Sequence, residues 1–391
     1  MTSHTGPDDV IATAAQAEEA TGNGGDSFTT LPRESYFSPE WFEREQELIF
    51  SRQWLYAGHE SEIRETGDFV TREVGDESVV VTRDESGEIH ALFNVCRHRG
   101  ARICPEPSGS MKRLVCPYHR WTYGLDGRLL GAPAMPDTFE RTKYPLHRAH
   151  VCSWNGLVFV NLSIDRPQQL RGIFERVQSD FDPFDVSGCK VAYSVTYDVA
   201  ANWKLILDNY YECYHCPGSH PELCRTFDLK HNPSGALLGE HSHPLFEYGH
   251  LPVKAGARSF TMTGEPVCKL LMGLLREEDL PVNIGFSLHP TTSGLFSGDY
   301  GIVFDFQPVA PRKSRVRCQW LVAGDAEEGR DYDVATLIEL WDVTNRQDWP
   351  LCEITQQGVL SRRFVPGPNS AEREPGIDGF RSRYLAMMGD G

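Results

Sequence analysis

The chain has 391 residues, 40% of them hydrophobic, which is enough to bury a sizeable core in about two or three domains. Asp and Glu outnumber Lys and Arg by 55 to 38, and the net charge of −17 argues against nucleic acid as the main partner. The sequence has no run of about eighteen apolar residues, and its start lacks the basic and apolar stretches of a secretory signal. We therefore expect a cytoplasmic protein without a membrane span, whose 11 cysteines stay reduced or bind metal.

The first predicted elements are a leader and a short helix. Residues 1–35 are rich in Ala, Thr, Gly and acidic side chains, a composition typical of disordered segments. A helix is predicted over residues 36–55, because Ser38 can cap its start and Pro39 suits the first helical turn. Both segments precede the first strand-rich region.

Two regions with different sequence patterns follow. Residues 56–165 predict an all-β domain, because short runs of β-branched and aromatic residues alternate with Gly-containing turns. From 166 to 391 helical stretches are mixed with strands, which is typical of an α+β domain. In this second region, the predicted helices cover 170–181, 202–214 and 334–351, and the predicted strands cover 191–199, 284–288, 301–307 and 315–322.

The all-β region contains two Cys/His pairs. Cys96 and His98 form the first pair, and Cys116 and His119 form the second pair after a gap of 17 residues. Two thiolates and two imidazoles can hold either zinc or an iron–sulfur cluster. Zinc sites usually keep both cysteines in one motif and both histidines in another, whereas each loop here offers one of each. This arrangement favours a two-iron cluster with both thiolates on one iron and both imidazoles on the other.

A second group of metal-binding residues lies in the α+β region. His215 and His220 are five residues apart in the stretch YECYHCPGSHPEL. Residues that share one helical face are three or four apart, so we expect a bend at Pro217 and Gly218 to bring the imidazoles together. Two histidines and one carboxylate form a facial triad that leaves positions on Fe(II) open for O2. The candidate carboxylates in the late helical stretch are Asp342, Asp348 and Glu353.

The segments NVCRHRGARI and CPYHRWTYGLDGRL resemble the cluster-binding loops of Rieske non-heme iron oxygenases, and the resemblance covers nearly all of the chain after the leader. It implies an α+β fold, with an N-terminal all-β Rieske domain and a catalytic domain of the helix-grip type, in which helices accompany an antiparallel sheet. The ligands that it implies for one [2Fe–2S] cluster are Cys96, His98, Cys116 and His119. The ligands that it implies for one mononuclear Fe(II) are His215, His220 and Asp348.

The same resemblance implies how the two centres cooperate. The acidic residue Glu212 bridges them, and the cluster of one subunit faces the iron of its neighbour in a homotrimer. No G-x-G-x-x-G fingerprint for a nicotinamide or flavin is present. The electrons are therefore expected from a separate NAD(P)H-dependent flavin and iron–sulfur reductase, with O2 as co-substrate for the oxidation of a small molecule.

NWKLILDNYYECYHC and TNRQDWPLCE are most similar to the branch that acts on glycine betaine, choline, carnitine and stachydrine. Enzymes of this branch hydroxylate or N-demethylate quaternary ammonium compounds, and demethylation releases formaldehyde. A quaternary ammonium cannot donate hydrogen bonds, so aromatic faces are expected to hold it. The aromatic candidates are Tyr210, Tyr211, Phe304, Phe306 and Trp349, and the acidic candidates beside them are Asp208 and Asp299.

Three other interpretations stay open. An aromatic ring-hydroxylating dioxygenase α subunit would have the same two metal sites but would form a cis-dihydrodiol. A Rieske electron carrier would need neither the facial triad nor residues 166–391. A zinc-binding interaction module would contain neither iron nor sulfide.

Overall fold

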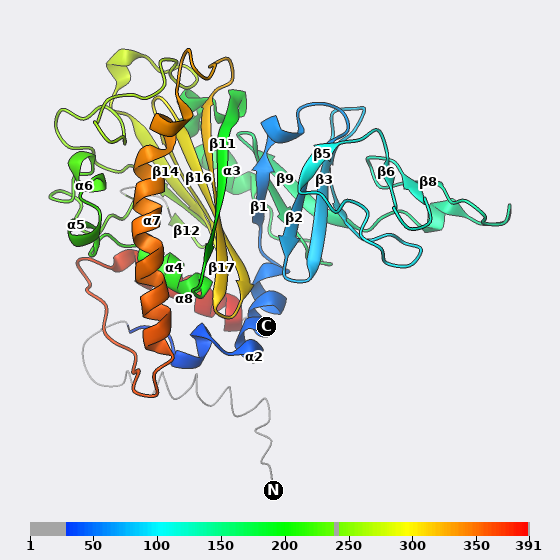
Figure 1. Ribbon diagram of the computed structural model, residues 1–391, viewed down its shortest axis with the longest axis horizontal. Coiled ribbons are helices and arrows are strands. Elements are labelled where there is room, and N and C mark those ends of the chain that lie inside the picture. Colours follow the sequence, from blue (N-terminus) through cyan, green and yellow to red (C-terminus); the bar gives the residue numbers. More distant parts are fainter. Residues whose placement is uncertain (1–28, 238–241, 390–391) are drawn as a thin grey trace, which may run out of the picture.

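The computed structural model describes residues 29–237 and 242–389 of the chain. Two lobes lie along its longest axis (Figure 1), one built mainly from the strands of residues 55–161 and the other from the elements of residues 171–237 and 242–389. Of the leader predicted for residues 1–35, residues 1–28 lie outside the described part. Leu31 is buried, and the Thr30 amide donates a hydrogen bond to the Gly367 carbonyl at 3.0 Å. The stretch before the first helix therefore packs against the C-terminal lobe.

The predicted N-terminal helix begins at its predicted capping residue. The Ser38 side chain accepts a hydrogen bond from the Trp41 amide, and Pro39 occupies the first turn. The buried Glu45 carboxylate then accepts a hydrogen bond from Lys204 at 2.5 Å, which ties this helix to the C-terminal lobe. The elements of this segment are η1 (Arg33–Tyr36), α2 (Pro39–Glu45) and the π-helical turn η2 (Gln46–Phe50).

The N-terminal lobe is an antiparallel β structure. Its main sheet has seven strands in the order β1-β10-β9-β4-β3-β2-β5, and a small sheet, β6-β7-β8, lies beside it. The two Cys/His loops leave this scaffold between β4 and β5 and between β6 and β7. The strands are β1 (Leu55–His59), β2 (Asp68–Val74), β3 (Glu77–Arg83), β4 (Ile89–Phe93), β5 (Ser108–Ser110), β6 (Leu114–Val115), β7 (Thr122–Tyr123), β8 (Leu129–Gly131), β9 (Arg148–Trp154) and β10 (Leu157–Asn161). Two 3-10 turns, η3 (Glu60–Ile63) and η4 (Arg141–Lys143), connect them.

The C-terminal lobe contains one antiparallel sheet of seven strands, in the order β11-β17-β16-β15-β14-β13-β12. Its strands are β11 (Cys189–Val199), β12 (Ser242–His243), β13 (Phe246–Gly249), β14 (Asn283–Leu288), β15 (Thr292–Ser297), β16 (Gly301–Ala310) and β17 (Lys313–Ala323). Its helices are α3 (Arg171–Phe181), α4 (Trp203–Tyr210), α5 (Cys216–Ser219), α6 (Leu223–Thr226), α7 (Val334–Val359) and α8 (Pro375–Gly389). The mixture of helices with an antiparallel sheet is the predicted α+β arrangement.

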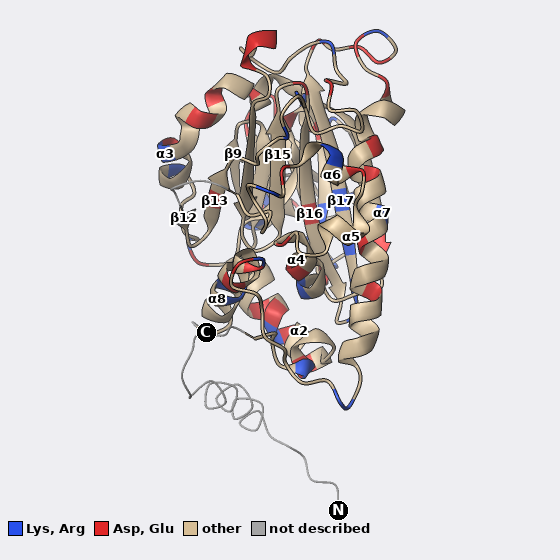
Figure 2. Cartoon of the chain, turned by 90° about the vertical axis from the view of Figure 1, so that its left-hand side faces the viewer, with Lys and Arg blue, Asp and Glu red and all other residues tan. Residues whose placement is uncertain are grey.

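The two faces of this sheet are covered by different helices. On β16, Phe304 and Phe306 join the core that includes α7, whereas Val303 points to the core that includes α3. Figure 2 shows α7 along one side of the sheet with α5 and α6 next to it, and α8 and α2 at the lower end. Among the described helices, none combines the length and the apolar character of a membrane span.

Helix α7 is longer than the predicted stretch 334–351. Asp333 caps its start, because the Asp333 side chain accepts a hydrogen bond from the Thr336 amide, and the helix continues past Pro350. A proline inside a helix removes one backbone hydrogen bond. Cys352 and Val359 beyond it are buried, and this packing keeps the last turns helical.

A buried ion pair joins the two lobes. The Arg72 guanidinium on β2 contacts both carboxylate oxygens of Asp305 on β16, with N–O distances of 3.0 Å. Arg317 adds a third contact to Asp305 at 3.3 Å, and the Asp305 side chain has no exposed surface. Nearby, the Tyr56 hydroxyl donates to Gln319 Oε1 at 2.8 Å. The interface is therefore held by polar contacts that water does not reach.

Arg72→Met is expected to lower the free energy of unfolding by about 3 kcal/mol, because it leaves the buried Asp305 carboxylate short of its main partner. The matched control is Arg102→Met. Arg102 pairs with Glu73 at 2.9 Å, but both side chains are more than 40% exposed, so its loss is expected to cost less than about 1 kcal/mol. Thermal melting of the two variants checks the prediction, and equal shifts in melting temperature would contradict it.

Candidate metal centres

The two predicted iron-binding histidines flank one short helix. Helix α4 is capped by Asn202 and ends at Tyr210, four residues before the end predicted from the sequence. After a bend, His215 stands at the N-cap of α5 and His220 at its C-cap. The prediction of a bend at Pro217 and Gly218 is wrong, because Pro217 lies in the first turn of α5. One helical turn between the histidines directs both side chains to the same side.

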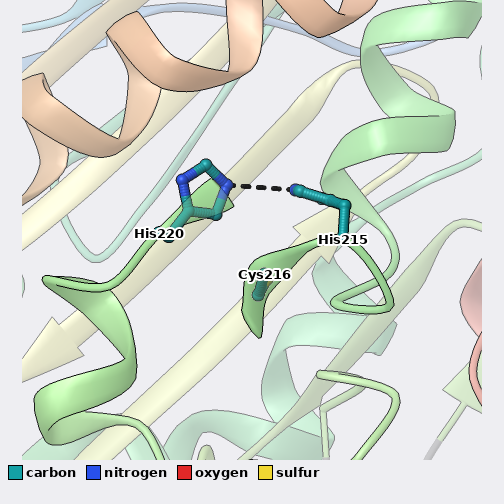
Figure 3. Close-up of side chains that lie close together, drawn as sticks. All are labelled: His215, Cys216 and His220. Atoms are coloured by element: carbon teal, nitrogen blue, oxygen red, sulfur yellow. Dashed lines mark hydrogen bonds between the residues drawn. The ribbon is translucent and has the colours of Figure 1, made fainter. Parts of the chain in front are cut away.

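Three ligand-type atoms converge at this point, as the two imidazoles in Figure 3 illustrate. His215 Nε2 lies 3.1 Å from His220 Nε2 and 3.1 Å from Asp348 Oδ1. The distance from His220 Nε2 to Asp348 Oδ1 is 2.9 Å. Metal–ligand bonds of about 2.1 Å at right angles place neighbouring ligand atoms about 3 Å apart. The triangle therefore has the size of one face of an octahedral metal site, with the opposite face open.

A second layer of side chains fixes the two imidazole rings. His215 Nδ1 and Glu212 Oε1 are 2.5 Å apart, and His220 Nδ1 and Gln347 Oε1 are 2.8 Å apart. Such partners hold the proton on Nδ1 and leave Nε2 as the ligand atom. Asn209 also approaches His215 Nε2, at 3.2 Å. These contacts fix the orientation of both rings.

The electrostatics of this group favour a bound cation. Burial alone lowers the pKa of His215, but hydrogen bonds to Asp348 and Glu212 outweigh it and raise the pKa to about 9. Burial raises the pKa of the Asp348 carboxyl, yet the two histidines lower it overall. Two imidazoles and a carboxylate with this charge preference and spacing fit a divalent iron ion.

The other candidate carboxylates of α7 lie away from this triangle. Asp342 accepts a hydrogen bond from the Tyr197 hydroxyl at 2.5 Å and pairs with Arg346 at 2.8 Å. Glu353 accepts a hydrogen bond from the Ala200 amide at 3.0 Å. Both are engaged in holding α7 to β11 and the turn that follows it.

The expectation that all cysteines stay reduced or bind metal is wrong for one pair. Cys213 and Cys216 form a disulfide beside His215, with a Cα–Cα distance of 4.9 Å. The bend after α4 brings these two residues within the separation that a disulfide needs. Cys104 is free and buried.

A cavity of about 340 Å³ opens onto the histidine and carboxylate triangle. Three of the predicted aromatic residues line it, Tyr210, Tyr211 and Phe304, whereas Phe306 and Trp349 are not among its lining residues. Phe306 packs behind Tyr210 with ring centroids 5.0 Å apart, and Trp349 packs against Tyr197. The sequence pattern did not reveal several further wall residues, which come from segment 225–282 and from α7. They include Phe227, Glu247, Phe260 and Trp341.

The acidic candidates Asp208 and Asp299 are not among the residues that line this cavity. Asp299 accepts hydrogen bonds from the Ser259 hydroxyl at 2.6 Å and from the Val267 amide at 2.7 Å. Asp208 lies near the Tyr36 hydroxyl, and burial raises its pKa to about 6. Both carboxyls serve internal contacts of the lobe.

The Cys/His loops of the N-terminal lobe converge in a different place, and like groups lie together. Burial raises the pKa of the Cys116 thiol, and the adjacent Cys96 thiol adds to this rise. The rings of His98 and His119 are 4.7 Å apart. His98 Nδ1 is buried and has no hydrogen-bond partner among the described residues, which is unusual for a buried polar atom that binds no ion. Paired thiols opposite paired imidazoles fit a two-iron cluster with mixed ligands.

Aromatic residues support these loops. Trp121 stacks on His98 with ring centroids 4.9 Å apart, and the Tyr123 hydroxyl lies 3.4 Å from Cys96 Sγ. Tyr118, next to His119, is 60% exposed. The histidine side of this site therefore lies at the protein surface, where another molecule can approach.

The two metal-binding groups of one chain are far apart. Figure 1 places the β6–β8 region at one end of the long axis, whereas α5 and α7 lie in the lobe at the other end. The large separation leaves no short route between the groups within one chain.

Two protein-family models match most of the chain. Residues 53–145 match the Rieske [2Fe-2S] domain, and residues 186–390 match the catalytic domain of the ring hydroxylating alpha subunit. The glycine betaine monooxygenase oxygenase subunit of Pseudomonas aeruginosa (strain UCBPP-PA14) is 37% identical over 383 residues, which are 92% of this chain and 89% of that protein. 

Two solved structures are similar as well. The quaternary ammonium Rieske monooxygenase CntA has a TM-score of 0.76 at 26% identity, over 93% of this chain and 96% of that one. Naphthalene 1,2-dioxygenase from Rhodococcus sp. has a TM-score of 0.72 at 23% identity, over 92% of this chain and 94% of that one, which indicates a shared fold. The chain therefore belongs to the Rieske oxygenases whose catalytic domain is that of the ring-hydroxylating α subunits, and it carries a [2Fe–2S] cluster.

Proposed function

We propose that this chain is the oxygenase component of a monooxygenase that hydroxylates an N-methyl group of a quaternary ammonium compound resembling glycine betaine. The observation that carries this proposal is the charge and composition of the cavity. Among the described residues that line it, three are carboxylates and none is Lys or Arg. A pocket of this kind favours a cation and disfavours an anion.

The aromatic walls suit the shape of a methylated ammonium group. The Tyr210 ring lies 5.4 Å from the Phe304 ring, and the Phe304 ring lies 5.9 Å from the Trp341 ring. Aromatic faces attract a cation without offering hydrogen bonds, which a quaternary ammonium could not use. The names of the relatives point the same way, because they include a glycine betaine monooxygenase and a quaternary ammonium monooxygenase studied for carnitine oxidation.

We assign the metal ligands by geometry and donor type. His215, His220 and Asp348 hold the mononuclear iron, and the mixed cluster binds to the two Cys/His loops, through Cys96, His98, Cys116 and His119. When bound, the cluster transfers single electrons and the ferrous ion activates O2. The protein residues orient the imidazoles, hold the substrate against the aromatic walls and keep bulk water from the reacting methyl group.

The stoichiometry of the reaction accounts for formaldehyde and a tertiary amine as products. One atom of O2 enters the N-methyl carbon and the other leaves as water, with two electrons and two protons consumed. The resulting N-hydroxymethyl group breaks at its C–N bond to give the tertiary amine, formaldehyde and a proton. The electrons come from a separate reductase, which we propose to be an NAD(P)H-dependent flavin and iron–sulfur protein, and the pair works in the cytoplasm.

The separation of the two sites in one chain supports a head-to-tail assembly, which we propose to be a homotrimer. The half-buried cluster histidines of one subunit would then face the Glu212 side of the next subunit. Inter-subunit electron transfer is also the subject of the CntA structure. Glu212 is suited to carry electrons across the subunit interface, because its carboxylate is bound to His215 Nδ1 at 2.5 Å.

Glu212→Gln is expected to slow the transfer of electrons from the reduced cluster to the iron by about 10- to 100-fold, because the amide no longer accepts two charge-assisted hydrogen bonds. Both metals should remain bound. Stopped-flow measurement of cluster reoxidation in the presence of O2 and substrate checks the rate. An unchanged rate with intact metal content would remove Glu212 from the electron path.

An aromatic ring dioxygenase is the alternative, and a product assay separates the two functions. The iron-loaded protein is supplied with NADH, a compatible reductase and O2, and formaldehyde is measured with glycine betaine, carnitine, choline or stachydrine. The proposal predicts formaldehyde from at least one of these compounds in proportion to the NADH consumed. Formaldehyde from none of them, together with a cis-dihydrodiol from an aromatic substrate, would establish the alternative.

A further inference from the structure

The geometry points to Glu247 as the residue that selects a positively charged substrate in the cavity. This inference rests on the proposed function and adds a specificity-determining residue to it. Within the described part of the chain, three carboxylates line the cavity: Glu212 and Asp348 belong to the iron group, and Glu247 is the third. Its role is therefore not explained by metal binding.

The strand pairing places Glu247 on the face of the sheet that forms the cavity. Glu247 on β13 lies opposite Ser287 on β14, Ser287 lies opposite Ser293 on β15, and Ser293 lies opposite Phe304 on β16. Directly opposed residues point to the same face of a sheet. This row runs from the carboxylate to the ring of Phe304, which packs against Tyr210. The charge of Glu247 thus stands at one end of the aromatic wall.

Contacts outside the cavity keep this carboxylate ionised. Its Oε2 accepts a hydrogen bond from Arg383 on α8 at 2.8 Å, and its Oε1 lies 3.4 Å from His289 Nε2. Burial raises the pKa of Glu247, but His289 and Arg383 outweigh this effect and the pKa is lowered. Glu247 is therefore negatively charged at neutral pH although its side chain is only 25% exposed.

The positive partner lies behind the carboxylate as seen from the cavity. Arg383 is not among the lining residues, and burial lowers the pKa of His289, which keeps that ring neutral. A cation in the cavity is therefore closer to the Glu247 carboxylate than to the Arg383 guanidinium. At short range in a partly buried site, one carboxylate changes the affinity for a cation substantially. The charge pair then favours a cationic group on the cavity side.

The test compares two probes that differ in one charge. Glycine betaine carries a trimethylammonium group, and 3,3-dimethylbutanoate carries a tert-butyl group of similar shape in the same place. Their dissociation constants are measured by calorimetry under anaerobic conditions with the iron-loaded protein, so that no turnover occurs. The quantity of interest is the preference, which is the dissociation constant of 3,3-dimethylbutanoate divided by that of glycine betaine.

Glu247→Gln is expected to lower this preference about tenfold, because the amide keeps the shape and the bond to Arg383 but not the charge. Arg383→Gln is the matched variant, since it breaks the same link between β13 and α8 while the cavity carboxylate stays. It should leave the preference unchanged or raise it. Opposite effects of the two variants would separate charge selection from a purely structural link.

Every other result of this binding experiment would contradict either the selective role of Glu247 or the proposed function. An unchanged preference in Glu247→Gln, or the same loss of preference in both variants, would refute the selective role of Glu247. Tighter binding of both probes to Glu247→Gln would also refute it, because it would place the substrate carboxylate against this residue. If the unaltered protein neither binds glycine betaine nor releases formaldehyde from any methylammonium compound, the proposed function itself fails.

Discussion

His215→Ala is expected to reduce turnover by more than about a thousandfold while the visible spectrum of the cluster stays unchanged. The variant loses one corner of the triangle formed by His215 Nε2, His220 Nε2 and Asp348 Oδ1, whose edges measure 2.9 to 3.1 Å. It also releases the Glu212 carboxylate from its bond to Nδ1. Two remaining ligands cannot retain the metal firmly, so the iron content should fall together with the activity.

The matched control for this experiment is Asp342→Asn. Asp342 lies on the same helix as Asp348, but it is bound to Tyr197 and Arg346. This variant should keep its iron and most of its activity, with a loss of stability of about 1 kcal/mol from the weakened contacts. If His215→Ala keeps both iron and activity, or if Asp342→Asn loses the iron instead, the triangle is not the iron site.

Cys116→Ser is expected to abolish the visible absorption of the [2Fe–2S] cluster completely and to stop turnover driven by the reductase. A serine hydroxyl has nearly the size of the thiol but is a poor ligand for this type of cluster, which requires thiolate sulfur. The mononuclear iron, which lies in the other lobe, should remain at its normal content. Absorption spectroscopy and metal analysis of the purified variant check both statements.

Cys104→Ser provides the comparison for the cluster experiment. Cys104 is a free, buried cysteine of the same lobe, and burial raises the pKa of its thiol to about 11. Cys104 belongs to neither Cys/His pair, so the variant should keep the full spectrum. Loss of the visible cluster absorption in Cys104→Ser, with that absorption retained in Cys116→Ser, would require a different set of cluster ligands.

The proposed metal ligands could be predicted from the sequence because metal binding restricts the spacing of its ligands. A two-iron cluster with mixed ligands needs one Cys and one His from each of two loops. This requirement produces the recognisable spacing of Cys96, His98, Cys116 and His119. The carboxylate ligand of the iron was harder to predict, because Asp348 is more than a hundred residues from His215 and His220. Only the resemblance to a known family separated it from Asp342 and Glu353, and the structure places it beside His215 and His220.

Local conformation and the cavity walls were less predictable. A Pro-Gly pair usually breaks a helix, yet Pro217 lies in the first turn of α5, where a proline loses no helical hydrogen bond. Helix α7 passes Pro350 because the residues beyond it are buried. Strand β15, with the sequence TSGLFS, has too few β-branched residues to be predicted as a strand from its sequence. The walls formed by Phe227, Glu247 and Phe260 come from a segment without regular periodicity, so only tertiary packing reveals them.

The content of iron, zinc and acid-labile sulfide, measured in the purified protein and in Asp348→Ala, tests whether the chain holds two separate iron centres. Two separate centres predict about three iron atoms and about two sulfides per chain, and about two of each after the substitution. Zinc in place of iron, or sulfide that disappears together with the Asp348 carboxylate, would contradict the existence of two independent iron centres.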